Sequence, residues 1–251
     1  MEAVFLTDQG KVRQHNEDSG GIFKNLDGHR LAIVADGMGG HRAGDVASSM
    51  TLNELKKQWE AVKGITTAEA AETWLKEEIL KVNRLLFEHA RNNSECDGMG
   101  TTIVAAIINE NFATIANIGD SRCYLLNESG FNQVTEDHSL VNELVRFGQI
   151  TKEDAEHHPR KNVLLRALGT EEKVELDSKT IMFEGGDCLL LCSDGLSNKV
   201  SEQEMMEILS SEAALEEKAQ NLVSLANENG GEDNITLAIV EFSEGNKGDE
   251  Q

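Results

Sequence analysis

Acidic residues stand beside glycines at the ends of apolar runs in this sequence. The run 31–35 (LAIVA) leads directly into Asp36, and the run 189–193 (LLLCS) leads into Asp194, with a glycine after each aspartate. Four further acids flank the ends of predicted strands: Glu17, Asp18, Asp120 and Asp233. A single Asp-Gly pair usually marks a turn. Because strand after strand ends in this way, we expect the six carboxylates to meet at one edge of a sheet.

Carboxylates gathered at such an edge have a defined chemistry. Ionised carboxylates within a few ångströms raise one another's pKa values, and a divalent cation relieves their repulsion. Oxygen ligands without pairs of Cys or His favour hard ions such as Mn²⁺ and Mg²⁺. A carboxylate that reaches two ions roughly 3.5–4 Å apart builds a site for in-line displacement at phosphorus. The pattern therefore predicts a metal-dependent hydrolase of phosphate esters.

One basic residue lies close to these acids in the chain. Arg13 precedes Asp18 by five residues on the same segment. A guanidinium group is always charged and can hold a phosphate group through two hydrogen bonds. We therefore expect Arg13 to bind the phosphate, while a surface ion pair is the alternative role for this side chain.

Composition excludes several classes of function. The chain has 23 Lys and Arg against 45 Asp and Glu, a net charge of -22. Such a surface repels nucleic acids and anionic membranes but suits divalent cations and basic polypeptides. No cysteine has an arginine six residues later, and there is no D-x-D, no G-N-H-[DE] and no G-x-x-x-x-G-K-[ST] motif. Cysteine-nucleophile phosphatases, aspartyl phosphotransferases, His-rich binuclear phosphoesterases and P-loop enzymes are thus not indicated.

The N-terminal residues and the cysteines indicate a cytoplasmic protein. The first residues lack the apolar core of a signal peptide, and no apolar run approaches the roughly 20 residues that cross a bilayer. The four cysteines contain no C-x-x-C pair, and two lie in the apolar run DCLLLCS. We expect reduced thiols buried in the core.

The hydrophobic pattern predicts blocks of strands alternating with blocks of helices. Asp27-Gly28 predicts a hairpin turn, and three later strands are expected to form a meander with short turns. A polar, His-rich insertion over 136–168 interrupts the rhythm. Its first part, 136–150, indicates a short helix and a turn. Predicted strands cover 4–8, 20–25, 29–36, 101–108, 112–118, 122–127, 187–193 and 235–242.

Four helices are predicted between these strands. The first covers 45–59, and the second begins at Thr66 with a Thr66-x-x-Glu69 capping box. Its apolar stripe has helical spacing; the residues are Leu75, Ile79, Val82 and Leu86. A third helix opens with the Ser201-x-x-Glu204 box, and a fourth spans 215–226. Such blocks favour an α+β fold with antiparallel sheets covered by helices, and the number of strands suggests two packed sheets.

An ordered set of motifs carries a family resemblance over nearly the whole chain. The motifs are RQHNEDS (13–19), ADGMGGHRAG (35–44), GMGTTIV (98–104), NIGDSRCY (117–124), HPRKNVLLRALG (158–169), LLLCSDGLS (189–197) and GEDNITLAIV (231–240). Together they resemble the metal-dependent serine/threonine protein phosphatases of the PPM or type-2C family, in particular the compact bacterial members. The resemblance implies a four-layer α-β-β-α sandwich of two antiparallel sheets. It also implies one domain over 1–243, with a flap at 136–168 and a flexible tail at 244–251.

The same resemblance implies roles for individual residues. Asp36 bridges two metal ions, Gly37 supplies its carbonyl group, and Asp194 and Asp233 hold the first ion. Asp18, together with Glu17, acts on the side of the second ion, partly through water. Asp120 and Asp194 match the positions that bind a third ion, and Arg13 matches the phosphate-binding arginine. Asn234 orients the site from behind the ligands. The implied cofactors are two Mn²⁺ or Mg²⁺ ions, with a third in bacterial members.

The implied reaction needs no phosphoenzyme. A hydroxide bridging the two ions attacks phosphorus in line, and the seryl or threonyl oxygen leaves. The sequence departs from the animal members at Met38, where these carry a histidine that is a candidate general acid. His41, three residues on, and a metal-bound water are the alternative donors, and His41 is otherwise a residue behind the ligands.

The implied function is hydrolysis of phosphoserine and phosphothreonine in proteins, opposing a bacterial Ser/Thr kinase. The expected partners are phosphoproteins, including a kinase domain, and the expected state is a monomer without nucleic acid or membrane insertion. Two alternatives stay open: a small-molecule phosphomonoesterase, and a metal-binding scaffold without catalysis.

Overall fold

Two antiparallel β-sheets packed face to face form the centre of the protein. The computed structural model describes residues 1–40 and 43–242. One sheet has the strand order β1 (Glu2–Asp8), β11 (Ile235–Glu241), β10 (Cys188–Cys192), β7 (Arg122–Asn127) and β8 (Gly130–Gln133). The other has the order β2 (Asp18–Lys24), β3 (Arg30–Met38), β5 (Ile103–Ile108), β6 (Phe112–Ile118) and β9 (Asp177–Met182), and β4 (Gly100–Thr101) pairs with β3.

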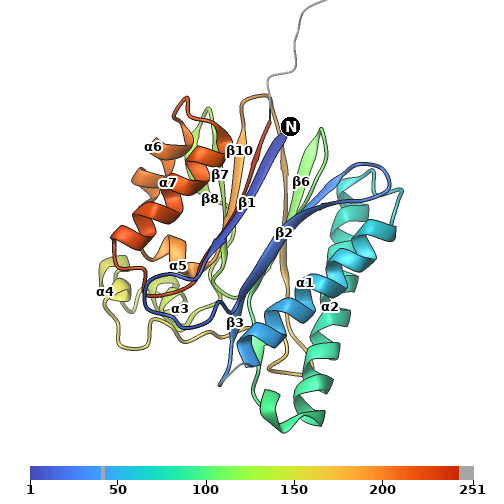
Figure 1. The fold of residues 1–251 in the computed structure, drawn as a ribbon, viewed down its shortest axis with the longest axis vertical. Helices are drawn as coiled ribbons and strands as arrows, with labels where there is room; N and C mark the ends of the chain where they lie inside the picture. Colours follow the sequence, from blue (N-terminus) through green and yellow to red (C-terminus); the bar gives the residue numbers. More distant parts are fainter. Residues whose placement is uncertain (41–42, 243–251) are drawn as a thin grey trace, which may run out of the picture.

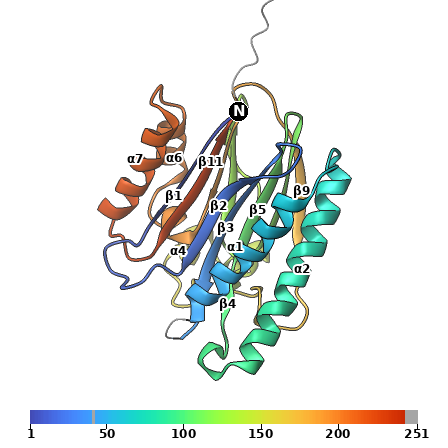
Figure 2. The same ribbon diagram turned by 45° about the vertical axis from the view of Figure 1, so that its right-hand side comes forward.

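Helices cover the outer face of each sheet (Figure 1). α1 (Ala43–Ala61) and α2 (Ala68–Asn92) lie on the β2–β9 sheet, and the turn η1 (Ser94–Cys96) follows them (Figure 2). α5 (Asp194–Ser197), α6 (Glu202–Leu209) and α7 (Leu215–Glu228) cover the β1–β8 sheet. The predicted α+β class and the four-layer arrangement are therefore confirmed.

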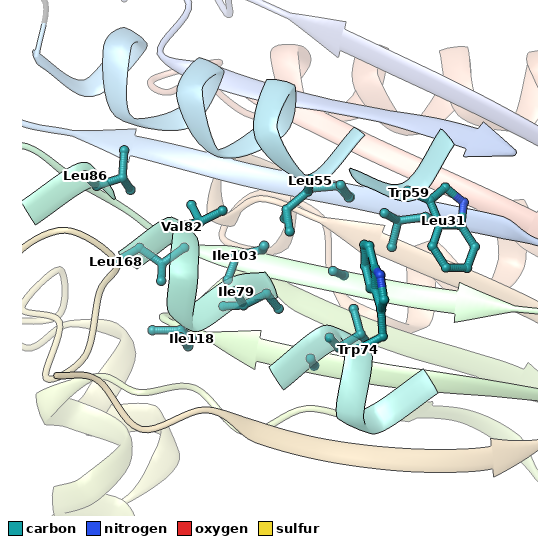
Figure 3. Packing of buried hydrophobic residues seen from close by; sticks show 14 of the residues in the cluster. Leu31, Leu55, Trp59, Trp74, Ile79, Val82, Leu86, Ile103, Ile118 and Leu168 are labelled. Atoms are coloured by element: carbon teal, nitrogen blue, oxygen red, sulfur yellow. The ribbon is translucent and has the colours of Figure 1, made fainter. Parts of the chain in front are cut away.

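The apolar strands are explained by burial on both of their faces. In β3, Leu31 and Ile33 pack under the helices, whereas Ala32 and Val34 point into the layer between the sheets. Successive side chains of a strand point to opposite faces, so a strand buried on both sides reads as a continuous apolar run. Figure 3 shows the helical side of this core, where the predicted stripe of α2 packs on the sheet. Trp59 of α1 meets Trp74 of α2 edge to face, with ring centroids 5.0 Å apart.

The prediction for the start of α2 is wrong by one residue. Thr67, not Thr66, is the N-cap, and its side chain accepts a hydrogen bond from the backbone N–H of Ala70. Two adjacent threonines offer the same chemistry, and the extended backbone of Thr67 (φ -120°, ψ 156°) decides between them. The capping box of Ser201 and Glu204 is confirmed, since both reciprocal bonds are present.

The predicted meander is also wrong at its last step. β5 and β6 pair as a hairpin, but β7 pairs with β10 and β8 in the other sheet. The chain therefore crosses from one sheet to the other through residues 119–121. Neither β8 nor β9 was predicted, because both are edge strands without an apolar run: β8 is only four residues long, and most of β9 is exposed and polar.

The insertion at 136–168, here called the flap, contains two short helices. These are α3 (Leu140–Arg146), which confirms the short helix expected there, and α4 (Lys152–Glu156). Backbone bridges join Ser139 to Leu164 and Leu168 to Thr101, so both ends of the flap are fastened. Figure 1 shows α3 and α4 at the end of the sandwich far from the N-terminus.

Three further predictions concern single features of the chain. All four cysteines are buried free thiols, as expected. The tail predicted at 244–251 lies outside the described residues. Within residues 1–40 and 43–242, no helix has both the length and the apolar character needed to cross a membrane.

Candidate metal centre

The pairing of β2 with β3 places two aspartates opposite each other. Asp18, the first residue of β2, is the direct partner of Asp36 in the antiparallel register. Directly opposed side chains in such a pair lie roughly 5 Å apart, and like charges there are destabilising. A one-residue slip would turn the apolar residues of both strands to the wrong face. The register that buries the core therefore forces the two carboxylates together.

Two more aspartates come from the neighbouring sheet. Asp194 lies just after β10, and Asp233 lies just before β11, the strand that pairs with β10. Ser193 connects the two sheets at this end. Its hydroxyl donates to Oδ2 of Asp18 over 2.8 Å and accepts the backbone N–H of Thr236 over 3.0 Å. The ends of β2, β10 and β11 are thereby held as one unit.

Asp120 enters from the crossing between the sheets. Its neighbour Ser121 lies 2.6 Å, oxygen to oxygen, from Thr102, and the Thr102 hydroxyl accepts the backbone N–H of Asp36 over 3.0 Å. The backbone N–H of Thr102 in turn donates to the carbonyl of Asp36. Thr102 thus connects the crossing that carries Asp120 to the strand end that carries Asp36.

Four of these aspartates, Asp18, Asp36, Asp120 and Asp194, have raised pKa values. The pKa of Asp18 is raised to about 7, mainly by burial and also by the charges of Asp194 and Asp233, although hydrogen bonds from Thr236 and Ser193 lower it in part. Burial also raises the pKa of Asp120 to about 8, with Asp194 as the next cause. The pKa of Asp36 lies well above its ordinary value because of burial and because of the other four aspartates. These five residues, here called the sandwich-end cluster, hold more negative charge than they can keep ionised together.

The loop before β2 brings a cation to the cluster. Nη2 of Arg13 lies 2.7 Å from Oδ2 of Asp233, and Nη1 lies 3.9 Å from Glu17. The Arg13 side chain is 45% exposed, so its remaining N–H donors are open to solvent. The surface ion pair considered as the alternative role is thus present in the structure, at the edge of the cluster.

Asn234 fastens this loop and is almost completely buried. Its amide nitrogen donates to the carbonyls of Gln9 and His15, and its amide oxygen accepts the N–H of Glu17. All three bonds go to backbone atoms of the segment before β2. Asn234 therefore orients the segment that carries Arg13.

Close backbone contacts explain two glycines of the motifs. A Cβ on Gly37 would overlap the carbonyl oxygen of Gly44, and a Cβ on Gly195 would overlap that of Asn234. The N–H of Gly37 also donates to the carbonyl of Glu17 over 3.2 Å. Any side chain at either position would push apart the segments that carry the acids.

The aspartates converge without forming a finished coordination sphere. Among residues 1–40 and 43–242, no three Asp, Glu, His or Cys side chains are already arranged around one point for an ion. The oxygens face protein donors instead: Asp233 faces Arg13, Asp18 faces Ser193, and Asp194 accepts from Asn198 over 3.0 Å. The register nevertheless places Asp18 opposite Asp36, and the charges of Asp194, Asp120 and Asp233 also act on Asp36. Their carboxylate oxygens are the type of ligand that Mn²⁺ and Mg²⁺ prefer.

Comparison with known proteins decides the family. Residues 9–233 match the family model described as protein phosphatase 2C. The chain is 55% identical over 241 residues to the serine/threonine phosphatase stp of Listeria welshimeri, an alignment that covers 96% of each protein. This chain belongs to the protein phosphatase 2C family. The predicted resemblance is therefore confirmed.

Solved structures of 2C phosphatases have the same fold. Stp1 from Staphylococcus aureus is similar with a TM-score of 0.93 and 42% identity, over 96% of this chain and 95% of that one. The catalytic domain of the phosphatase PstP, solved with two manganese ions, is similar with a TM-score of 0.82 and 34% identity. That comparison covers 95% of this chain and 96% of PstP.

The 2C fold of this chain brings together most residues singled out in the sequence. The described ones are Arg13, Glu17, Asp18, Asp36, Gly37, Asp120, Asp194, Asp233 and Asn234. His41 lies outside the described residues, so its role as a proton donor stays a prediction. Met38 ends β3.

Sequence reasoning missed the polar residues that hold the acids in place. Ser193 and Ser121 each stand next to a predicted ligand, Asp194 and Asp120, inside motifs that were already recognised. Their adjacency was the available signal. His138 was missed altogether, because only the fold brings it to Gly119.

Proposed function

We propose that this 2C phosphatase hydrolyses phosphoserine and phosphothreonine in proteins with the help of Mn²⁺ or Mg²⁺. The observation that carries the proposal is the sandwich-end cluster itself. Five aspartates from both sheets converge beside an exposed arginine, at an end of the sandwich that the flap borders. The names of the Listeria and Staphylococcus relatives support the same substrate class.

The proposed ligands follow from the donor set. Asp36 and the carbonyl group of Gly37 would hold ions at the core of the site, and Asp194 and Asp233 would hold the first ion. Asp18 would serve the second ion, with Glu17 acting partly through water, and Asp120 with Asp194 would hold a third. When bound, such ions lower the pKa of water and neutralise charge on phosphoryl oxygens. The two manganese ions in the PstP structure support the proposed dependence on metal ions.

Arg13 would bind the phosphoryl group. Asp233 holds one of its N–H groups, which fixes the guanidinium plane, and the exposed donors remain for the equatorial oxygens of the phosphate. Asn234 holds the segment on either side of Arg13 through the carbonyls of Gln9 and His15, which keeps the guanidinium group in place. The net charge of -22 repels a phosphorylated substrate, and the cations at this site would provide the local attraction.

The partners we propose are phosphorylated proteins, including the cytoplasmic domain of a bacterial Ser/Thr kinase. We further propose that the chain acts as a cytoplasmic monomer, that residues 1–243 form a single domain, and that residues 136–168 move as a flap.

The test is phosphate release from a phosphothreonine peptide, with Mn²⁺ and with chelator. Wild type is compared with Asp36→Asn and with Asp97→Asn, an exposed aspartate that also precedes a glycine. We expect Mn²⁺-dependent release that is lost in Asp36→Asn and kept in Asp97→Asn. Release that persists in chelator would contradict the proposal. A folded wild type that binds Mn²⁺ without turnover would indicate the scaffold, and faster hydrolysis of small phosphate esters than of peptides would indicate the phosphomonoesterase.

A further inference from the structure

One histidine of the flap makes two hydrogen bonds to Gly119, the residue that precedes Asp120. His138 is 6% exposed. Its Nδ1 accepts the backbone N–H of Gly119 over 3.2 Å, and its own backbone N–H donates to the Gly119 carbonyl over 2.9 Å. Both polar atoms of Gly119 are therefore bound by the same residue.

The other side of the imidazole faces an ion pair. Because Nδ1 accepts a hydrogen bond, the ring proton is assigned to Nε2, which donates to Oδ2 of Asp177 over 3.1 Å. Oδ1 of Asp177 accepts from Nη1 of Arg166 over 2.9 Å. Burial lowers the pKa of His138, which keeps the ring neutral and able to accept.

These contacts connect three parts of the chain that are distant in sequence. His138 lies at the start of the flap, Arg166 lies at its end, and Asp177 begins β9. The N–H of Leu165 also donates to the carbonyl of His138 over 2.8 Å, so the two ends of the flap meet at this residue.

Gly119 has no freedom to move away from the histidine. Its φ of +101° is a conformation that suits glycine, and a Cβ there would lie 2.6 Å from a side-chain carbon of Thr102. Gly119 is thus enclosed between His138 on one side and Thr102, the residue bonded to Asp36, on the other. A displacement of His138 would be transmitted to the next residue, Asp120.

We propose that His138 is a positioning residue that fixes Asp120 through Gly119 and, through Asp177 and Arg166, makes the placement of Asp120 depend on the flap. The inference rests on the proposed function insofar as Asp120 binds an ion there. The hydrogen bonds between His138 and Gly119 do not depend on that function, and a separate experiment tests them.

Two variants of matched chemistry separate the two sides of the ring. In His138→Asn, the amide oxygen replaces Nδ1 and keeps the acceptor for Gly119. In His138→Gln, the longer amide reaches the position of Nε2 and loses that acceptor. Amide hydrogen exchange by NMR, in chelator, is expected to show the Gly119 amide protected in wild type and His138→Asn. Exchange at least about tenfold faster is expected in His138→Gln. Unchanged protection in His138→Gln would overturn the proposal.

The Mn²⁺ concentration for half-maximal phosphate release tests the link to Asp120. Loss of a group that orients a ligand costs roughly 10- to 100-fold in metal affinity. We expect about a tenfold rise in His138→Gln. A smaller rise, about threefold, is expected in His138→Asn, which keeps the acceptor for Gly119 but loses the bond to Asp177.

A double-mutant cycle distinguishes a specific effect on Asp120 from general damage to the fold. In an Asp120→Asn background, His138→Gln should change the same Mn²⁺ concentration by less than twofold, because its target is gone. An equal effect in both backgrounds would overturn the proposal. A wild type without any Mn²⁺-dependent release would refute the proposed function, and the exchange experiment would still decide whether His138 holds Gly119.

Discussion

Asp120 and Asp137 stand before and after the same strand pair, β7 and β8, in contrasting surroundings. The carboxylate of Asp137 accepts hydrogen bonds from Nε and Nη2 of Arg122 over 3.0 and 2.7 Å, and another from the side-chain amide of Gln133. Asp120 is raised in pKa by burial and then by the carboxylate of Asp194, which Arg122 only partly offsets.

The contrast separates structural carboxylates from candidate ligands. We call the residues Asp137, His138 and Asp177, with Arg122 and Arg166, the flap base. There each carboxylate has a guanidinium partner from the chain. Among residues 1–40 and 43–242, the five carboxylates of the sandwich-end cluster have one direct ion pair, that of Asp233 with Arg13. A buried charge needs a partner, so the cluster is where a cation from solution belongs.

The largest expected effect is on turnover. Asp194→Asn should lower Mn²⁺-dependent phosphate release by roughly 10³-fold or more, because loss of a direct ligand exceeds the 10- to 100-fold cost of an outer partner. In chelator the variant should melt at or above the wild-type temperature, since one of several like charges is removed. A calorimetric scan showing a marked loss of stability would place Asp194 with the structural carboxylates instead.

The reverse is expected at the flap base. Asp137→Asn leaves Arg122 without its charge partner, and breaking a buried pair costs 3–5 kcal/mol. Because both side chains keep some exposure, we expect a loss of about 3 kcal/mol in the free energy of unfolding by urea. The exposed control Asp97→Asn should lose less than about 0.5 kcal/mol. Equal unfolding free energies for Asp137→Asn and Asp97→Asn would show that Asp137 is not a structural carboxylate, which contradicts the contrast between the flap base and the sandwich-end cluster.

Metal ions should stabilise the protein only through the sandwich-end cluster. At 100 times its dissociation constant, Mn²⁺ should add about 2.7 kcal/mol to the unfolding free energy. The increment should remain in Asp137→Asn and largely disappear in Asp36→Asn. Thermal unfolding with and without Mn²⁺ measures it, and a full increment in Asp36→Asn would contradict the assignment.

The smallest expected effect is a dependence of metal-free stability on pH. A carboxyl whose folded-state pKa is raised binds its proton more tightly when folded, so its ionisation destabilises the fold. For Asp18, raised to about 7, this penalty should grow as pH rises from about 4 to about 8. Burial alone would raise the pKa of Asp177, but His138 and Arg166 lower it overall. Its stabilising contribution should therefore be fully present above about pH 4 and be lost only at lower pH.

Urea unfolding in chelator at several pH values separates the two cases. The free energy of unfolding of Asp18→Asn, relative to that of wild type, should rise by about 1 kcal/mol or more between pH 5 and pH 8. The difference in unfolding free energy between Asp177→Asn and wild type should not change with pH over that range. A flat difference for Asp18→Asn would show that Asp18 is not held among like charges.

The sequence was sufficient for features that depend on local pattern. The runs 112–118 and 122–127 were predicted with the bounds that β6 and β7 have. The acids of the sandwich-end cluster could be singled out because apolar strands end on them. The crossing at 119–121 could not be predicted, because a short polar link after an apolar strand looks the same whether the next strand pairs beside it or joins another sheet.

Contacts between distant segments were beyond the reach of the sequence. The partner of Asp137 is 15 residues away, and the partners of His138 are 19 and 39 residues away. Nothing in the spacing of Arg122 distinguishes it from an ordinary surface cation. The same holds for Asn234, whose three bonds reach a loop more than 200 residues earlier.

The crossing from β6 to β7 also has a mechanical consequence. Only three residues separate Ile118 from Arg122, and a fully extended link of that length spans at most about 14 Å. Packed sheets lie about 10 Å apart, so the link has little slack. Sliding of one sheet over the other would pull on this link before it disturbed most of the interface. Asp120 is the middle residue of this link, so such sliding would move Asp120 relative to the other aspartates of the cluster.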